Sequence, residues 1–534
     1  MKLLQRLCTI VTLLSAAYII NAQNVTYTPP THTETWYSTG TFYELFVRSF
    51  YDSDGDRHGD FNGVTQQAEY LKSLGITGIW FMPIMSSSDH SHGYATIDYM
   101  DTEQQYGTMA DFENMVNTLH NLGIRVIIDF VVNHCSHQHP FFVDAKKNPK
   151  SPYRDWFVWA DNKEGETYWY KTPTGYYYGY FSSHMPDFNY ENPKVIEYMK
   201  SVMIFWLDKG VDGFRYDAVT HITGDVKRDI EFFRVFRSVI EEAPYKEREP
   251  FLICEASTKP YSDYLGDGTD SFHAAFNFTS SFVWRRTVRD EKPIADNGVN
   301  LIEDEIRKYC TGWTAVQSGA YYAQLIANHD AGVTGRYRPF REFGCVEGKA
   351  KLAGTLYMTL PGIPFVYYGE EIGVDSDPRF KGDRFIRTAM HWTPDENAGF
   401  TTGKNAWNGI TDNYKQYNVR TQDARPDSLL NRYRSVISVR NEHKALSLGT
   451  FTSLPNQNNN NQLIAYLRQY NDENIVVIHN FGSKPLSNIK IDLTGCSIMS
   501  DKPAVLLGKS KIAIKNNILS VTKLNKYDSI IIKL

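Results

Sequence analysis

The stretch GVTQQAEYLKSLGITGIWFMPI, residues 63–84, decides the fold of this chain. Its first half has the apolar spacing of a helix that ends at Gly75, and its second half is a nearly continuous apolar run, as in a strand covered on both faces. The same unit follows downstream, where residues 111–123 predict a helix and residues 124–134 predict a strand. Helices alternating with buried strands indicate βαβ units around a parallel sheet.

The alternation stops between residues 135 and 190, where aromatic residues, Gly, Pro and Lys accumulate without a clear helical period. A long irregular insertion in a regular fold is usually functional. The alternation resumes with a predicted helix at 193–210 and continues to a last helix that ends near residue 446. Beyond that point, short apolar runs separated by Asn- and Gly-containing turns are typical of a small antiparallel sandwich.

Composition narrows the classes of function. A chain of 534 residues has room for more than one domain. The net charge of −5 and the lack of a long basic run make nucleic acid an improbable partner. Aromatic residues make up 14% of the chain, which suits carbohydrate, because apolar sugar faces stack on aromatic rings. Filling a large core accounts for part of the same excess.

The first residues resemble a secretory signal. Lys2 and Arg6 precede an apolar stretch at 7–20, and a cleavage site is expected near Ala22. The stretch is short for a membrane span, although an uncleaved anchor stays an alternative. We therefore expect export to the periplasm or the medium, with no membrane span in the mature chain. The five cysteines beyond this segment are odd in number and scattered, which does not predict a disulfide framework.

Three acidic residues each follow a short apolar run of the buried-strand type. Asp217 lies in VDGFRYDAVTH, Glu255 in FLICEAS and Asp330 in LIANHD. A buried carboxylate is costly unless it is paired or used, and catalytic groups of βα barrels lie at the carboxyl ends of the strands. The three acids therefore predict one site, and paired carboxylates are what glycoside hydrolysis requires.

Seven motifs in order make the chain resemble an α-amylase-type member of glycoside hydrolase family 13 over residues 40–534. They are GITGIWFMPI, DFVVNH, MPDFN, GFRYDAVTH, ICEAS, IANHD and GIPFVYYGEEIG. MPDFN resembles the marker of a group intermediate between oligo-1,6-glucosidases and neopullulanases, which contains α-amylases.

The resemblance implies an α/β fold: a (β/α)8 TIM barrel with an inserted domain after strand 3 and a C-terminal antiparallel β-sandwich. The expected divisions of the chain are a signal peptide at 1–22, a catalytic barrel at 23–134 and 191–446, an inserted domain at 135–190 and a β-sandwich domain at 447–534.

The resemblance also implies separate roles for the three acids. Asp217 matches the nucleophile, and a carboxylate that attacks the anomeric carbon forms a glycosyl-enzyme intermediate. Glu255 matches the general acid/base, and its apolar neighbours favour a raised pKa. Asp330 matches the third acid, which binds sugar hydroxyls in the distorted state. Arg215, two residues before Asp217 on the same face, is expected to keep Asp217 ionised.

Further positions match residues that bind the sugar or support the site. His134 and His329 match histidines that bond hydroxyls of the sugar being cleaved, and Tyr94 in SHGYATIDY matches the aromatic residue that stacks under it. Asp129 matches an acid that supports the site indirectly. His221 matches a position on the leaving-group side, but Thr220 stands where the family often has Lys, so binding on the product side is expected to differ.

The loop DSDGDRHGD, residues 52–60, is a separate signal. Its aspartates place hard oxygen ligands on a tight loop, which suits Ca²⁺. It is not an EF-hand, because Arg57 stands where Gly is required and Gly63 where the bidentate Glu would be. It resembles the calcium loop after strand 1 of some family members. That likeness implies the following ligands, the fourth of them through its carbonyl: Asp52, Asp54, Asp56, His58 and Asp60.

Two questions about metal binding stay open, one at the loop 52–60 and one at Asn133. A solvated acidic turn would have the same composition as the loop at 52–60. Asn133 matches a calcium-binding Asn of many α-amylases, but its partners in the inserted domain are not identified from the sequence.

We expect retaining endo-hydrolysis of α-1,4 bonds in starch-like glucans by a monomeric enzyme. Ala218 follows the nucleophile, and in the family small residues there accompany α-1,4 specificity. The alternatives are an exo-acting α-glucosidase or oligo-1,6-glucosidase, and an α-glucan transglycosylase such as a trehalose-forming enzyme. A more remote alternative is a non-enzymatic glucan-binding or transporter-associated relative.

Overall fold

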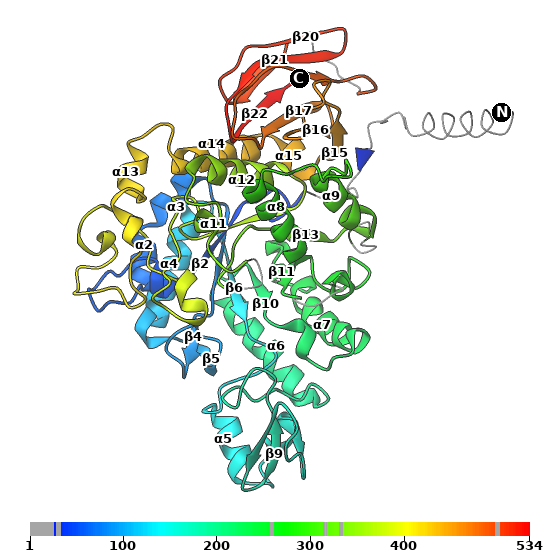
Figure 1. Cartoon of the computed structure of the whole chain (residues 1–534). Coiled ribbons are helices and arrows are strands. Elements are labelled where there is room, and N and C mark those ends of the chain that lie inside the picture. The colour runs from blue at the N-terminus through cyan, green and yellow to red at the C-terminus, as the bar shows by residue number, and fades with distance from the viewer. Residues whose placement is uncertain are drawn as a thin grey trace, which may run out of the picture.

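The computed structural model describes residues 26–27, 34–256, 261–312, 316, 318–330, 335–496 and 502–534. A central barrel lies between two smaller parts, the inserted domain at one end and the C-terminal sheets at the other (Figure 1). The expected signal peptide at 1–22 lies outside the described residues. Within the described ranges, no helix has both the length and the apolar character needed to cross a lipid bilayer.

Eight parallel strands close the barrel in the order β10–β11–β12–β13–β14–β2–β3–β6. In chain order the barrel strands are β2 (Phe42–Leu45), β3 (Gly78–Phe81), β6 (Arg125–Phe130), β10 (Gly213–Tyr216), β11 (Phe251–Cys254), β12 (Ala274–Phe276), β13 (Tyr321–Gln324) and β14 (Ile363–Tyr367). The predicted TIM barrel is therefore confirmed.

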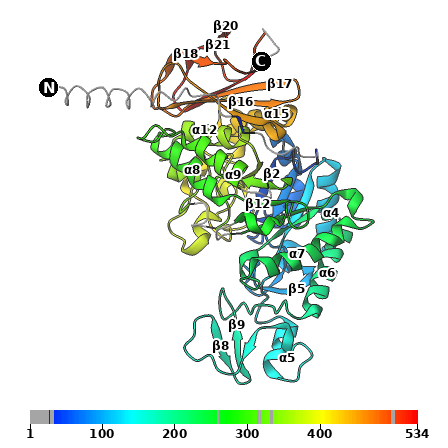
Figure 2. The same cartoon turned by 90° about the vertical axis from the view of Figure 1, so that its right-hand side faces the viewer.

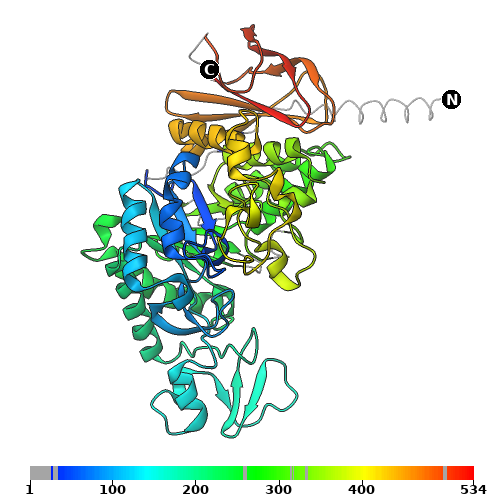
Figure 3. The ribbon, with the colours of Figure 1, turned by 90° about the vertical axis from the view of Figure 1, so that its left-hand side faces the viewer.

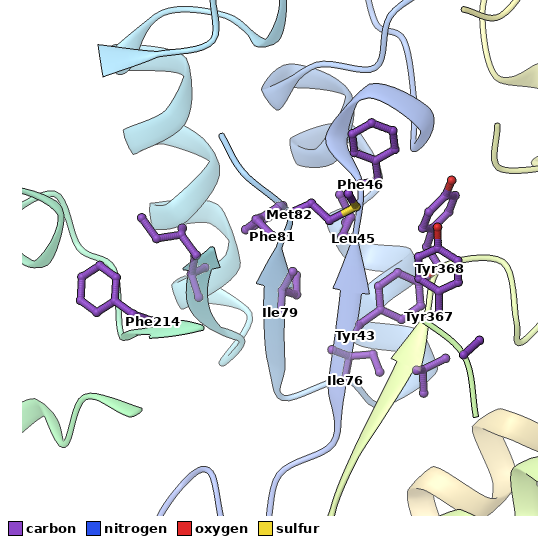
Figure 4. Packing of buried hydrophobic residues seen from close by; sticks show 14 of the residues in the cluster. Tyr43, Leu45, Phe46, Ile76, Ile79, Phe81, Met82, Phe214, Tyr367 and Tyr368 are labelled. Carbon is purple, nitrogen blue, oxygen red and sulfur yellow. The ribbon is translucent and has the colours of Figure 1, made fainter. Parts of the chain in front are cut away.

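Alternating side chains of these strands build two layers of core. Phe42, Trp80 and Phe365 belong to the cluster that fills the barrel interior. Their neighbours in sequence, such as Tyr43 and Ile79, belong to the larger cluster between strands and helices, part of which is drawn in Figure 4. Both faces of each strand are thus buried, which explains the continuous apolar runs in the sequence.

The base of β10 requires glycine. Gly213 has φ 154°, and a Cβ there would lie 2.0 Å from the carbonyl oxygen of Phe251 on the next strand. Only a residue without a side chain permits this approach. The strand that carries Arg215 and leads to Asp217 is thereby held tightly against β11.

Helices cover the outside of the barrel (Figures 2 and 3). They are α2 (Phe61–Gln66), α3 (Ala68–Leu74), α4 (Met109–Asn121), α6 (Pro193–Asp208), α7 (Val226–Glu241), α8 (Phe278–Asp290), α9 (Leu301–Gly312), α11 (Pro339–Glu342), α12 (Glu347–Thr359), α13 (Val419–Asp423), α14 (Leu429–Glu442) and α15 (Lys444–Leu448). The predicted end at Gly75 is confirmed: this residue has φ 89° and closes α3 in the left-handed conformation.

The inserted segment is a small folded unit. It contains the helix α5 (Pro140–Lys147) and a three-stranded sheet in the order β7–β9–β8. The strands are β7 (Trp159–Ala160), β8 (Trp169–Thr172) and β9 (Gly175–Tyr178). The barrel side adds a hairpin of β4 (Met85–Ser87) and β5 (Thr96–Thr102).

The C-terminal part consists of two antiparallel sheets with an apolar core of their own. The six-stranded sheet has the order β1–β15–β16–β17–β22–β19, and the three-stranded sheet has the order β18–β21–β20. Their bounds are β1 (Thr26–Tyr27), β15 (Thr450–Leu454), β16 (Leu463–Tyr470), β17 (Glu473–Asn480), β18 (Leu486–Asp492), β19 (Ala504–Leu507), β20 (Ile512–Lys515), β21 (Ile518–Leu524) and β22 (Asp528–Lys533). The predicted antiparallel domain is confirmed. Strand β1 pairs with β15, so this early segment joins the C-terminal sheet, although the sequence grouped it with the barrel.

Candidate active site

A pocket of about 320 Å³ lies at the carboxyl ends of the barrel strands. Asp217, Glu255 and Asp330 all line it, although they come from three separate strand ends. The other lining residues are His92, Tyr94, His134, Phe181, Ser182, Met185, Ala218, His221, Asp383 and Arg387. The three predicted acids therefore do share one site.

Arg215 lies beneath this pocket and joins three carboxylates. Its Nη1 atom donates to Oδ1 of Asp217 at 2.6 Å and to Oδ1 of Asp129 at 2.8 Å. Its Nη2 atom lies 3.1 Å from Oε2 of Glu255. The side chains of Arg215 and Asp129 are almost completely buried, so the ion pairs are shielded from water.

Three carboxyl groups share one guanidinium. Its single positive charge cannot balance three negative charges, so ionisation of all three carboxyls is unfavourable and the cluster retains protons. Burial raises the pKa of Asp217 to about 7, against the opposing effect of Arg215. Burial likewise raises the pKa of Glu255 to about 7. Asp217 has the shorter contact with Arg215, which favours the ionised form on Asp217 and the proton on Glu255.

The residue after Asp217 also contacts the acid/base candidate. The backbone N–H of Ala218 donates to Oε2 of Glu255 at 3.0 Å. Ala218 has φ 49° and ψ 38°, a left-handed conformation that β-branched residues rarely adopt. This turn places the small side chain of Ala218 on the pocket wall.

Asp330 is held by a second arginine, Arg387. Nη2 of Arg387 donates to Oδ1 of Asp330 at 3.0 Å, and Nε of Arg387 donates to the carbonyl of His329 at 2.8 Å. The same Nη2 atom lies 3.4 Å from Oδ2 of Asp383. Two arginines, one beneath and one beside the pocket, therefore balance its acids.

A hydrogen-bonded chain supports the pocket floor. Oη of Tyr94 donates to Oδ2 of Asp129 at 3.0 Å and lies 2.6 Å from Nε2 of His329. Nδ1 of His329 lies 2.6 Å from Oε1 of the buried Glu44. Burial lowers the pKa of His329 well below its ordinary value, which keeps the ring neutral. The ring of Tyr94 is thus fixed at the pocket wall.

His134 presents a free ring nitrogen in the site. Its Nε2 atom is buried and has no hydrogen-bond partner among the described residues, while the residue lines the pocket. Burial lowers the pKa of His134 to about 3, so the ring is neutral. A buried nitrogen without a partner is costly unless a ligand pairs with it, which fits the expected contact with a sugar hydroxyl.

The structure brings all nine predicted catalytic and substrate-binding residues to this site. Six of them line the pocket: Tyr94, His134, Asp217, His221, Glu255 and Asp330. The other three lie beneath it and reach it through hydrogen bonds: Asp129, Arg215 and His329.

The sequence reasoning missed several lining residues, above all Arg387 and Asp383. Asp383 lies in a short 3-10 helix, η7 (Gly382–Ile386), after the last barrel strand, and Arg387 directly follows this helix. Phe181 and Met185 come from the inserted segment, and only Met185 stood in a quoted motif. The available signal for Arg387 was a single charged residue in the otherwise uncharged run FIRTAM.

The loop at 52–60 offers a cation site built from three of its five predicted ligands. Single ligand atoms of Asp52, Asp54 and Asp60 all lie within 4.8 Å of one another. Burial raises the pKa of Asp60, and the nearby carboxylate of Asp54 raises it further. Hard carboxylate oxygens at this spacing fit Ca²⁺. Asp56 lies outside this group and accepts instead from the backbone N–H of His58 at 2.8 Å.

The structure also gives Asn133 a partner from the inserted segment. Oδ1 of Asn133 and Oδ2 of Asp187 are both buried without hydrogen-bond partners. Burial raises the pKa of Asp187 to about 7, and the side chain of Asn133 opposes this shift through a hydrogen bond. Asp187 belongs to the MPDFN motif, so this motif supplies a buried acid next to Asn133 of the barrel.

The sequence of this chain matches the family described as alpha amylase, catalytic domain, over residues 44–449. With the barrel and its site, this match shows that the chain belongs to the α-amylase family of glycoside hydrolases and is an enzyme of that type. The predicted family is therefore confirmed.

Individual relatives carry several names. "Alpha-amylase 3" of Dictyoglomus thermophilum is 36% identical over 94% of this chain and 95% of its own length. "Trehalose synthase/amylase TreS" of Mycolicibacterium smegmatis is 33% identical over 83% of this chain and 82% of its own length. The solved α-amylase of H. orenii has a TM-score of 0.79 at 32% identity, over 92% of this chain and 99% of that one. These names differ in the reaction that they state.

Proposed function

We propose that this enzyme cleaves internal α-1,4-glucosidic bonds of starch-like glucans with retention of configuration. The observation that carries the proposal is the shared guanidinium: Asp217 and Glu255 contact the two terminal nitrogens of Arg215. This arrangement holds the carboxyls close together, and retaining enzymes need a separation of about 5–5.5 Å.

The reaction proceeds in two steps, in which Asp217 is the nucleophile and Glu255 transfers the protons. Asp217, ionised beside Arg215, attacks the anomeric carbon while Glu255 gives its proton to the departing glycosidic oxygen. Glu255, now ionised, then takes a proton from water, and the resulting nucleophile releases the sugar from Asp217. Asp330 and Nε2 of His134 hold hydroxyls of the distorted ring, as their places on the pocket wall allow.

Calcium has a supporting part in this proposal. When bound, the ion would hold the loop after β2 through the carboxylates of Asp52, Asp54 and Asp60. No step of the reaction uses it, because these ligands do not line the pocket.

The small residue after the nucleophile supports the choice of bond. Ala218 lies on the pocket wall in a left-handed conformation. A Val at this position would add two methyl groups next to Glu255 and would strain the backbone. The room left by Ala218 suits the leaving sugar of an α-1,4 bond.

One observation favours an exo-acting or transferring enzyme as the second candidate. The ion pair between Arg387 and Asp383 stands beside Asp330, and for this second candidate we infer that it closes that end of the pocket. A pocket closed at one end would hold a chain terminus rather than the middle of a chain. Relatives named oligo-1,6-glucosidase and trehalose synthase/amylase are 30% and 33% identical to this chain.

A comparison of starch, maltose and isomaltose as substrates separates the candidates. The proposal predicts that iodine staining of starch is lost rapidly while little glucose is formed. Glucose from isomaltose as the main product, or trehalose from maltose, would contradict it.

An extracellular or periplasmic site of action belongs to the same proposal, because starch does not cross membranes. Mass spectrometry of the exported protein should then place its first residue near position 23.

A further inference from the structure

A buried acid that the proposed reaction does not use lies behind His329. Glu44 stands two residues after Phe42 on β2, so its side chain points into the same barrel interior, nearer the carboxyl end of the strand. It is only 1% exposed, and within the described part of the chain its ion-pair contact is the ring of His329, with no Lys or Arg beside it. A buried carboxylate without a cation is costly, so the state of Glu44 needs a physical reason.

Both ring nitrogens of His329 have close oxygen neighbours. Oε1 of Glu44 accepts the backbone N–H of His329 at 3.1 Å and lies 2.6 Å from Nδ1. The other nitrogen, Nε2, lies 2.6 Å from Oη of Tyr94 and 3.3 Å from Oδ2 of Asp330. A neutral imidazole carries its proton on one nitrogen only. The place of this proton therefore decides which of these contacts attract.

A proton on Nδ1 would leave two contacts repulsive. The lone pair of Nε2 would face Oδ2 of Asp330. The single hydroxyl proton of Tyr94 would turn to Nε2, and Oδ2 of Asp129, 3.0 Å away, would then face a lone pair of the tyrosine oxygen. Glu44 would in addition carry a buried negative charge. Buried polar groups without a proton between them are costly, so this arrangement is disfavoured.

A proton on Nε2 makes every one of these contacts attractive. Glu44, as a neutral acid, donates to Nδ1 of His329. Nε2–H donates to Oη of Tyr94 and faces Asp330, and the hydroxyl of Tyr94 is free to donate to Asp129. Burial raises the pKa of Glu44 well above its ordinary value and lowers that of His329 well below it, which agrees with the neutral form of both.

This arrangement holds Asp330 at both of its oxygens. Nη2 of Arg387 donates to Oδ1 at 3.0 Å, and Nε2–H of His329 faces Oδ2 at 3.3 Å. A carboxylate held in this way keeps one orientation in the pocket, and an oriented group lowers the barrier because little freedom is lost in the transition state. The proton of Glu44 thereby affects an acid that it does not touch.

We propose that Glu44 is a positioning residue that, as a neutral carboxylic acid, donates to Nδ1 of His329 and so turns Nε2–H toward Tyr94 and Asp330. The inference deepens the proposed function and rests on it for the role of Asp330. Glu44 does not line the pocket, and no bond of the substrate is made or broken on it.

The place of the proton on His329 can be measured without turnover. Correlation NMR of the full-length protein labelled with ¹⁵N-histidine distinguishes a protonated ring nitrogen from an unprotonated one. The signals of His329 are those that disappear in His329→Gln. We expect Nε2 protonated and Nδ1 unprotonated in the wild type near neutral pH. A protonated Nδ1 would overturn the proposal.

Two substitutions of Glu44 connect the proton to the reaction. Glu44→Gln keeps a neutral group with an N–H donor for Nδ1, whereas Glu44→Met has similar size and no donor. The Gln variant should keep kcat within about threefold of the wild type, and the Met variant should lose about 30-fold in kcat with KM changed by less than about threefold. Equal losses in the two variants would mean that the donor has no part in positioning, and would overturn the proposal.

Glu371→Met is the matched control. Glu371 is also fully buried and accepts from the hydroxyls of Tyr43 at 2.8 Å and Tyr70 at 2.6 Å, but it does not line the pocket or contact His329. Its removal should lower the Tm and leave kcat of the folded protein unchanged. A loss of kcat as large as that of Glu44→Met would show a general effect of removing a buried acid, and would contradict the specific role of Glu44.

Failure of the proposed function has a different signature. A wild-type ring protonated on Nε2, in an enzyme that cleaves or transfers at another α-glucosidic bond, would reject only the choice of reaction. The kinetic comparison of Glu44→Gln with Glu44→Met is then made on the substrate that the enzyme does use, with the same expected outcome.

Discussion

Nη1 of Arg215 lies 2.6 Å from Oδ1 of Asp217, two residues further along the same strand end. Side chains two residues apart point to the same face of a strand, so the contact follows from the local backbone. It gives the buried Asp217 a positive partner. The same guanidinium reaches Asp129 and Glu255, so one side chain fixes three acids.

Arg215→Lys should lower kcat on soluble starch by about 10²–10³-fold. Lysine keeps the charge but has one compact ammonium group in place of a planar fork, so it cannot hold three carboxylates at once. With weaker pairing, the pKa of Asp217 should rise and the acidic limb of the pH–rate profile should move to higher pH. Rates measured between pH 4 and 9 test this. A profile that keeps its wild-type acidic limb would contradict the assigned role.

Glu255→Gln should stabilise the fold at high pH while it abolishes hydrolysis. The carboxyl has a pKa of about 7 in the folded protein, against roughly 4.3 in an unfolded chain. Between these values the unfolded chain releases the proton first, so the contribution of Glu255 to stability is full below about pH 4 and is lost as the pH rises through about 7.

Glutamine does not ionise, so the variant should match the wild type near pH 4 and have a Tm about 2 °C higher at pH 8. Calorimetric scans at the two pH values measure this difference. A variant that is less stable than the wild type at pH 8 would show that burial does not penalise the ionised carboxyl. Hydrolysis of glucan at the wild-type rate would refute the acid/base role.

Chelation of calcium should lower the Tm of the wild type. An ion that binds only the folded state stabilises it by about 2.7 kcal/mol at a concentration of 100 Kd. Asp54→Asn is the informative variant, because the backbone N–H of Asp56 that Asp54 accepts within the loop can also be accepted by the amide oxygen of Asn. Asp60, by contrast, caps α2 through the N–H of Gly63.

Asp54→Asn should remove the effect of calcium on the Tm without lowering the Tm measured in EDTA. Metal analysis of the purified protein supplies an independent readout. A wild-type protein with no bound metal and the same Tm in EDTA would show that the loop is an acidic turn rather than a metal site.

Arg468 should prove important for stability although it is far from the pocket. Its guanidinium is buried and donates to the carbonyls of Thr359 at 2.7 Å, Leu446 at 2.9 Å and Gly449 at 2.9 Å. Burial lowers its pKa to about 10. It thus joins the C-terminal sheet to the helices of the barrel.

Arg468→Lys would leave some of these buried carbonyls without donors, at about 1–3 kcal/mol for each unsatisfied group. Urea unfolding should show this loss, while kcat on starch at 25 °C stays unchanged. Arg425→Lys, at an exposed ion pair with Glu347, is the control and should change stability by less than about 1 kcal/mol. Equal effects of the two substitutions would contradict the account.

The sequence predicted the barrel where its strands are long apolar runs, and it failed where they are not. Strand β12 has only three residues, Ala274–Phe276, and only its pairing with β11 and β13 identifies it. Helix α5 was missed because the aromatic residues around it hide its period. Short elements depend on contacts that the local sequence does not show.

The site was predictable where a motif follows a strand. Asp217, Glu255 and Asp330 stand directly after apolar runs or within quoted motifs, and all three line the pocket. Arg387 and Phe181 come from irregular loops, and tertiary packing alone brings them to the pocket. The metal loop was predicted as five ligands; Asp56, which accepts from the backbone N–H of His58, lies outside the group of Asp52, Asp54 and Asp60.

The anomeric configuration of the first product tests the central claim most directly. Attack by Asp217 followed by attack of water inverts the anomeric carbon twice, so cleavage of an α-linked glucan must first release the α-anomer. Proton NMR of amylose during the first minutes of hydrolysis distinguishes the two anomers before mutarotation mixes them. The account predicts that the α-anomer signal grows first; an initial β-anomer would show direct attack by water and would contradict the role given to Asp217.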